Sequence, residues 1–144
     1  MTKQQIAGMS QIYVSTHFTL AEVLHTERPE LQSGLQACDI NNIQLMAGVM
    51  EAVRLVLERP IIVSSWFRSP ALNKAVGGVR NSAHLYGLAV DFEVSSTEFR
   101  RVANAKVIDY DQAIYYPSQS FMHLGYRLNE YGFPSNRRQI IYKK

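Results

Sequence analysis

One long segment of the chain repeats apolar side chains at helical spacing. Between residues 42 and 58 they recur three or four positions apart, which places them on one helix face, and they are Ile43, Ala47, Met50, Val53 and Leu57. Asn41 or Asn42 can cap this helix, and Arg59-Pro60 ends it. The pattern predicts a helix that packs on a core, and we assign it no chemistry.

Capping signals predict three shorter helices. Each begins after a Thr or Ser whose side chain can accept a hydrogen bond from the first turn. The predicted segments are 20–26 after Thr19, 70–76 after Ser69, and 98–104 after Ser95. We interpret residues 1–16 as an arm or a short edge element, and residues 30–40 as a loop.

Short β-rich runs predict the sheet. Ile61-Ile62-Val63-Ser64-Ser65 is a β-branched run and predicts a buried strand. The other predicted strands are residues 88–94, 113–116, 121–126 and 139–142. Because helices come first and mostly antiparallel strands follow, we predict an α+β fold with a small sheet and helices packed on one side.

The composition is that of a globular protein. With 144 residues, 47% of them hydrophobic and 19% charged, the chain can bury a proper core, and we expect a single domain over residues 1–144. The lone Cys38 excludes an intramolecular disulfide and is predicted to be a small buried hydrophobic residue. A net charge of +3 without an aromatic-basic motif predicts no nucleic-acid partner.

No apolar run approaches the roughly 20 residues that a membrane span requires. The first residues, Met1-Thr2-Lys3-Gln4-Gln5-Ile6, lack the apolar region of a signal peptide. The expectation is therefore a protein made in the cytosol without a membrane span.

An acidic residue, Asp91, interrupts the apolar strand predicted over 88–94. Aspartate is depleted in strands and is rarely buried without a partner. Strand alternation puts Asp91 and Glu93 on the face opposite the apolar positions. A cation is the simplest partner for such a carboxylate.

Two histidines can join Asp91 around that cation. Alternation in 121–126 puts His123 on the face away from the core, and His84 lies on a loop that Gly87 can fold back. A His, Asp, His set suits zinc and leaves a fourth position for water, which is the catalytic arrangement. In the alternative interpretation, His84 is a loop residue, Asp91 a turn cap and His123 a sheet histidine with satisfied hydrogen bonds.

The segment Ser82-Ala83-His84-Leu85-Tyr86-Gly87-Leu88-Ala89-Val90-Asp91 resembles a motif of the zinc D-alanyl-D-alanine carboxypeptidase family, S-x-H-x-x-G-x-A-x-D. That family includes phage L-alanyl-D-glutamate endolysins. The resemblance covers roughly residues 17–142, and its other segments include Ser64-Ser65-Trp66-Phe67-Arg68-Ser69-Pro70, Met122-His123 and Arg138-Gln139-Ile140-Ile141. It implies the small α+β fold shared with the N-terminal domain of hedgehog proteins.

The resemblance also implies roles for single residues. His84, Asp91 and His123 match the zinc ligands. Arg68 matches an arginine that holds a substrate carbonyl or carboxylate, a task that suits the fork of a guanidinium. Ser82 matches a serine that can hydrogen-bond substrate. Without the resemblance, Arg68 would pass as a surface arginine and Ser82 as a turn residue.

The general base of the family has no clear match. The family uses a carboxylate near the zinc ion, and the two corresponding positions here hold Ser120 and Tyr116. A tyrosine, with a pKa near 10, is a poor base but can donate a hydrogen bond to an oxyanion. Glu93, on the same strand face as Asp91, is a possible replacement acid, or a solvated strand residue.

The sequence thus predicts a zinc-dependent peptidase that acts on peptidoglycan stem peptides or cross-links, with a monomer favoured. A compact protein without a signal peptide is compatible with a phage protein that reaches the cell wall by another route. The missing acid at Ser120 and Tyr116 motivates an alternative, a zinc-containing peptidoglycan-binding module without turnover. A virion-associated structural protein is a further alternative.

Overall fold

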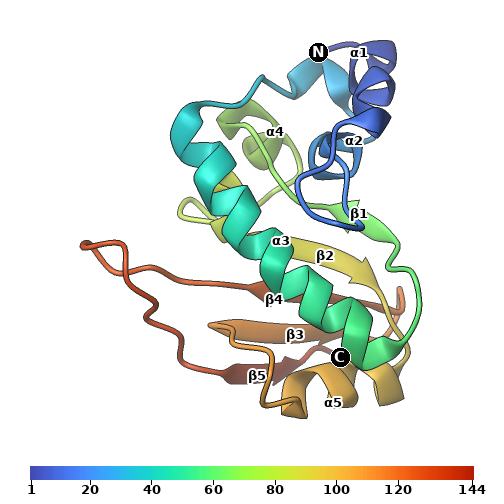
Figure 1. Cartoon of the computed structure of the whole chain (residues 1–144), viewed down its shortest axis with the longest axis vertical. Helices are drawn as coiled ribbons and strands as arrows, with labels where there is room; N and C mark the ends of the chain where they lie inside the picture. The colour runs from blue at the N-terminus through green and yellow to red at the C-terminus, as the bar shows by residue number, and fades with distance from the viewer.

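The computed structural model describes residues 1–144 and is built on one five-stranded sheet of order β1-β2-β4-β3-β5 (Figure 1). The strands are β1 (Val63–Ser65), β2 (Ala89–Glu93), β3 (Gln112–Tyr116), β4 (Phe121–Gly125) and β5 (Gln139–Tyr142). All neighbouring pairs are antiparallel except β3 and β5, which are parallel. The α+β class and the mostly antiparallel sheet are confirmed.

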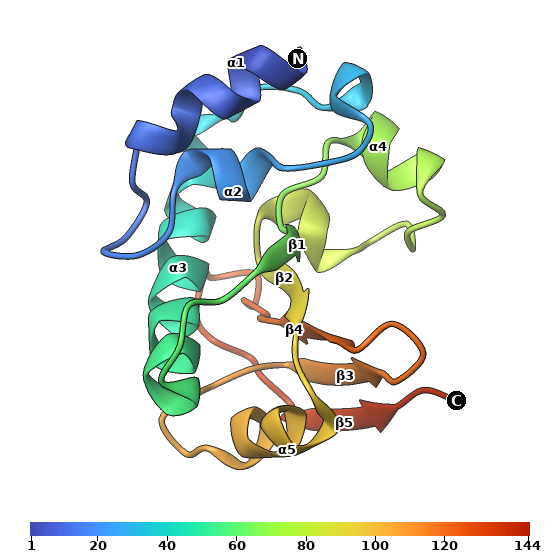
Figure 2. The same ribbon diagram turned by 90° about the vertical axis from the view of Figure 1, so that its right-hand side faces the viewer.

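Two helices cover one face of this sheet. They are α3 (Ala37–Leu57) and α5 (Ser96–Asn104), and Figure 2 shows both on the same side of the strands. The predicted apolar stripe of α3 is buried, and it joins Val90, Phe92, Met122 and Leu124 of the sheet in a single core cluster. No helix of the chain combines the length and the apolar character needed to cross a bilayer.

The remaining helices are short. They are α1 (Lys3–Ala7), α2 (Leu20–Leu24), α4 (Pro70–Ala75) and the 3-10 turns η1 (Gly8–Gln11), η2 (Pro29–Leu31) and η3 (Ala83–Tyr86). Thr19, Ser69 and Ser95 each accept a hydrogen bond from the first turn of the helix that follows, so the predicted caps are confirmed. Ile6 of α1 packs into the core.

The start of α3 and the surroundings of Cys38 differ from the prediction. The helix begins at Ala37 because the Asp39 carboxylate accepts a hydrogen bond from the Gln36 N–H at 2.9 Å and so satisfies the helix start. Cys38 therefore lies in the first turn, ahead of Ile43, the first buried residue of the helix. It is exposed, and the prediction of a buried cysteine was wrong.

The strand predicted over residues 61–65 is also shorter and less buried than expected. β1 begins at Val63 and pairs only with β2, so it is an edge strand. Ser64 is exposed and Ile62 is 57% exposed, whereas Ile61 is buried just before the strand. The apolar run over residues 61–65 therefore does not form a strand that is buried on both faces.

Strand alternation gives the sheet two unlike faces. Val90 and Phe92 point into the core, while Asp91 between them points to the opposite face, as predicted. That opposite face lines a cleft of about 780 Å³. The acidic residue in the apolar strand is therefore a cleft residue.

Candidate metal centre

The pairing of β2 with β4 brings two of the predicted ligands together. Asp91 and His123 are directly opposite each other in the antiparallel register, so their side chains emerge on the same face. Only the sheet pairing joins them, because 32 positions separate them along the chain. The register of the sheet thus creates the centre of the site.

His84 reaches the same point from η3, the 3-10 turn before β2. Gly87 ends this turn in the left-handed region, with φ of +73°. An added Cβ there would lie 2.6 Å from Cγ1 of Ile43 in α3, so a glycine satisfies both the backbone and the packing. The turn folds back as expected and holds the His84 ring over the sheet.

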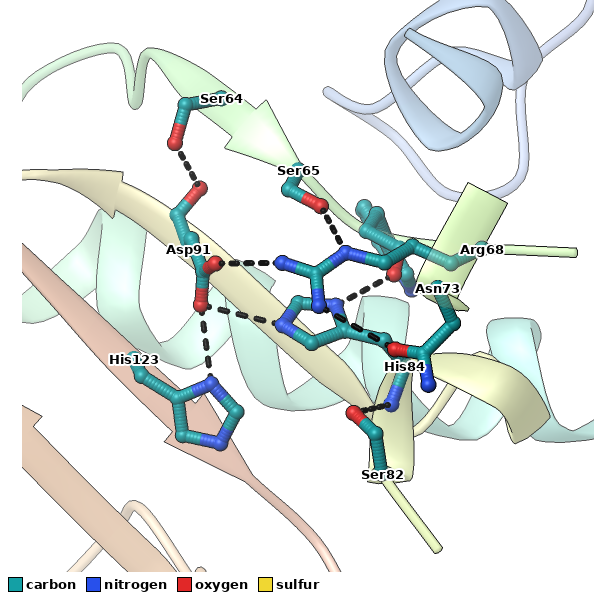
Figure 3. A network of polar contacts seen from close by, with 9 residues as sticks. Ser64, Ser65, Arg68, Asn73, Ser82, His84, Asp91 and His123 are labelled. Carbon is teal, nitrogen blue, oxygen red and sulfur yellow. Dashed lines mark hydrogen bonds and ion pairs between the residues drawn. The ribbon is translucent and has the colours of Figure 1, made fainter. Parts of the chain in front are cut away.

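The three side chains converge on one carboxylate oxygen, as Figure 3 shows. The Oδ1 atom of Asp91 lies 2.9 Å from Nδ1 of His123 and 3.2 Å from Nε2 of His84. All three donor atoms lie within 4.8 Å of one another. In a tetrahedral zinc site with bonds of about 2.1 Å, donor atoms are about 3.4 Å apart, so this cluster has a fitting size.

The orientation of the His84 ring suits a metal ligand at this point. The carbonyl oxygen of Trp66 can only accept, so His84 donates its Nδ1–H to it across 2.6 Å. Burial lowers the pKa of His84 more than Asp91 raises it, and Nε2 is the ring nitrogen that remains available to an ion. Nε2 lies 3.2 Å from Oδ1 of Asp91, so an imidazole nitrogen and a carboxylate oxygen are directed to the same point.

Asp91 is held as a carboxylate. Burial acts to raise its pKa, but the two histidines beside it outweigh burial and hold the pKa of Asp91 well below its usual value. Its side chain is 11% exposed, and that of His84 only 2%. An ionised carboxylate with so little contact with water is a hard oxygen ligand suited to zinc.

Arg68 lies beside the second oxygen of that carboxylate. Its Nη2 atom is 3.4 Å from Oδ2 of Asp91, and its Nε donates to Oγ of Ser65 at 3.2 Å. The guanidinium is mostly buried and lines the cleft. The structure therefore brings Arg68 to the predicted ligands, and it shows an additional contact with Asp91 that sequence reasoning did not foresee.

Asn73 is a site residue to which sequence reasoning assigned no role. Its Oδ1 accepts from Nη1 of Arg68 at 3.4 Å, and its Nδ2 donates to the Val79 carbonyl at 2.9 Å. A Cβ on Gly78 would lie 2.0 Å from Oδ1 of Asn73, so only glycine leaves room for this amide. The sequence shows an asparagine in a short helix that is followed by Gly77-Gly78. It does not show that the side chain of this asparagine is buried.

Ser82 and Tyr116, two further residues proposed from sequence, both line the cleft. The Oγ atom of Ser82 accepts from the His84 N–H at 3.3 Å, so this serine caps η3. The Tyr116 ring stacks on Phe121 with 4.5 Å between the centroids. Burial and the charge of Asp91 raise the pKa of Tyr116, so its phenol is a hydrogen-bond donor at neutral pH.

Glu93 lies at the exposed end of β2 and is not one of the residues that line the cleft. The carboxylates that do line it are Asp91 and Asp111. Asp111 is bound by Arg137 through two hydrogen bonds of 2.9 Å. Both carboxylates of the cleft are therefore engaged by arginines, and Asp91 also contacts His84 and His123.

Comparison with known proteins identifies a family whose sequence pattern this chain matches. The sequence model of the peptidase M15 family matches residues 16–125. The zinc D-Ala-D-Ala carboxypeptidase of Streptomyces albus G is 40% identical over 57 residues, which make up 39% of this chain and 22% of that protein. The match thus spans less than a quarter of the length of that curated relative.

Proposed function

This chain belongs to the peptidase M15 family, and on that premise we propose that it is a zinc-dependent peptidase. Its substrates are peptidoglycan stem peptides or cross-links, in keeping with the D-Ala-D-Ala carboxypeptidase of Streptomyces albus G that it resembles. The observation that carries the proposal is the convergence of Nε2 of His84, Oδ1 of Asp91 and Nδ1 of His123 within 4.8 Å of one another. The site of action is accordingly the cell wall.

His84, Asp91 and His123 would hold the ion through Nε2, Oδ1 and Nδ1. A zinc ion held there supplies Lewis acidity, which polarises a peptide carbonyl and makes water acidic near neutral pH. The carbonyl of Trp66 orients His84, and Arg68 steadies the carboxylate of Asp91. These contacts keep the donor atoms in place before substrate arrives.

Arg68 and Tyr116 would act on the peptide. The Arg68 guanidinium, fixed by Ser65 and Asn73, offers its remaining N–H groups to a carbonyl or carboxylate of the substrate. The Tyr116 phenol also lines the cleft and can donate a hydrogen bond to the carbonyl oxygen as negative charge develops on it. Ser82 lies at the cleft wall, where its hydroxyl can also donate to substrate.

Cleavage assays on defined substrates test this proposal. Purified protein loaded with zinc is incubated with stem pentapeptides and with cross-linked muropeptides, and products are separated by chromatography and identified by mass. Release of D-alanine would mark a carboxypeptidase, whereas a cut between L-alanine and D-glutamate would mark an endolysin-type endopeptidase. We expect one of these, and its loss in His84→Ala. No cleavage of any of these substrates by zinc-loaded protein would refute a peptidase function.

The engaged state of both cleft carboxylates favours a second candidate function. Asp91 belongs to the metal centre and Asp111 is bound to Arg137, so neither is free to take a proton from water. On this hypothesis the protein binds peptidoglycan through the same cleft without turnover. It predicts stoichiometric zinc and retention on insoluble peptidoglycan, with no fragments released, and detectable zinc-dependent cleavage would exclude it.

A further inference from the structure

The charges that line the cleft do not cancel. Two of its cations are paired, Arg68 with Asp91 and Arg137 with Asp111. Arg127 and Lys143 also line the cleft, and neither forms an ion pair. The four cations of the lining thus exceed its two carboxylates by two, and this excess of positive charge favours an anionic ligand.

Arg127 and Lys143 stand at opposite ends of the strands. Arg127 follows β4 by two residues, at the end where Gly125 pairs with Gln112. The Lys143 N–H donates to the carbonyl of Tyr115 at 2.9 Å, so Lys143 continues β5 alongside Tyr116. Figure 2 shows the C-terminus leaving β5 near the turn between β3 and β4, and Figure 1 shows the segment after β4 projecting from the other end.

The candidate metal centre lies between these two ends. His123 pairs with Asp91 on one side and with Ile114, the middle residue of β3, on the other. From Gln112 to Tyr116 the strand rises by four steps of about 3.4 Å, or about 14 Å. An extended peptide advances about 3.3–3.6 Å per residue, so roughly four of its residues span β3. More than four are needed to reach from Arg127, two residues past the end of β4, to Lys143 beside β3.

From this arrangement we infer that the cleft selects an extended peptide that carries a carboxylate on each side of the bond presented to the metal centre. Arg127 binds one carboxylate and Lys143 the other. The inference rests on the proposed function, since it concerns the peptide bound at that same centre. It narrows the substrate class to stem peptides with free carboxylates, as opposed to amidated ones.

Direct binding tests the inference without relying on turnover. The probe is a stem tetrapeptide with two carboxylates, one on D-glutamate and one at the C-terminus. It is prepared with both carboxylates free, with either one amidated, and with both amidated. Its affinity for the full chain is measured by titration calorimetry, with and without zinc. Because Arg127 and Lys143 are both exposed, we expect about 10-fold tighter binding of the diacid than of the diamide at low salt, and less at high salt.

Two variants and two matched controls assign the contacts. Arg127→Gln and Lys143→Met should each lower the preference for the diacid to about 3-fold, and each should abolish discrimination at a different carboxylate. Arg100→Gln and Lys106→Met remove the same charge from exposed positions outside the cleft, and should leave the preference unchanged.

The outcomes separate this inference from the proposed function. Equal affinity of the wild type for diacid and diamide would overturn the inference, as would an equal loss of preference in the two controls. If diacid and diamide bind with equal affinity and both are cleaved, the proposed function stands and only the inference is refuted. Preference for the diacid without any cleavage would support the inference and argue against a peptidase.

Discussion

Asp91 and His123 face each other across β2 and β4, with 2.9 Å between Oδ1 of the carboxylate and Nδ1 of the imidazole. A one-residue slip between these strands would turn either side chain into the core face. The apolar residues Phe92 and Met122, which are also paired, prevent such a slip because they are fully buried on the other side. The packing of the core thus maintains the geometry of the candidate metal centre.

Zinc binding should depend on all three side chains. We expect wild-type protein to hold one zinc ion per chain after loading and desalting, measured by elemental analysis. His84→Ala and His123→Ala should each weaken zinc affinity by more than about 100-fold. Loss of a residue that only supports a ligand costs about 10–100-fold, and loss of the ligand itself should cost more. His25→Ala, which removes a half-exposed histidine outside the cluster, should leave the stoichiometry at one. A wild type that holds no zinc would contradict the assignment of the site.

Zinc should also stabilise the fold, because the three ligands come together only in the folded chain. At a free zinc concentration 100 times its dissociation constant, the free energy of unfolding should rise by about 2.7 kcal/mol. For a domain of this length that corresponds to an increase in Tm of about 5–10 °C, measured by scanning calorimetry with and without a chelator. His84→Ala should melt at the same temperature under both conditions.

Gly87→Ala should be strongly destabilising. The residue has φ of +73°, and an added methyl group would lie 2.6 Å from Cγ1 of Ile43. Backbone strain and overpacking together should cost about 2–4 kcal/mol in urea unfolding.

Substitutions at two other glycines separate the cost of backbone strain from the cost of overpacking. Gly132 has φ of +81° with open space around it, so Gly132→Ala should cost only about 1 kcal/mol. Gly34 has neither feature, and Gly34→Ala should change stability by less than about 0.5 kcal/mol. If Gly87→Ala cost no more than Gly132→Ala, the contact with Ile43 would not restrict this position.

The parts of the fold that follow from periodicity could be predicted from the sequence. The buried stripe of α3 repeats at helical spacing, and the two faces of β2 alternate at strand spacing, so Met50 and Asp91 were placed on the correct sides. Such patterns suffice because a side chain's direction depends mainly on local backbone geometry. They also brought Asp91 and His123 to the same face of the sheet before any pairing was known.

Features that depend on backbone acceptors and on burial could not be predicted in this way. The contact from His84 to the Trp66 carbonyl uses a group that every residue has, so no sequence signal marks it. The early start of α3 uses Gln36 and Asp39 in place of the usual Ser or Thr cap. The direct opposition of Asp91 and His123 depends on a register between strands that no hairpin joins.

Away from the cleft, Glu98 should make stability depend on pH. Arg59 donates two hydrogen bonds to its carboxylate, at 2.7 and 3.0 Å, and these hydrogen bonds lower the pKa of Glu98 from 4.5 to about 2. Because the folded-state pKa is the lower one, the unfolded chain takes up the proton first as pH falls. The stabilisation is therefore complete above about pH 5 and is lost progressively down to about pH 2.

Glu98→Gln tests this pH dependence, because it removes the charge and keeps the shape of the side chain. Both side chains are partly exposed, 32% for Arg59 and 24% for Glu98, so screening should limit the loss at pH 7 to about 1 kcal/mol. In urea unfolding, this difference from wild type should shrink between pH 5 and pH 3. Glu130→Gln, at an exposed position without an ion pair, should stay within about 0.5 kcal/mol of wild type throughout. A Glu98→Gln difference that stays constant with pH would mean that the variant acts through packing and not through charge.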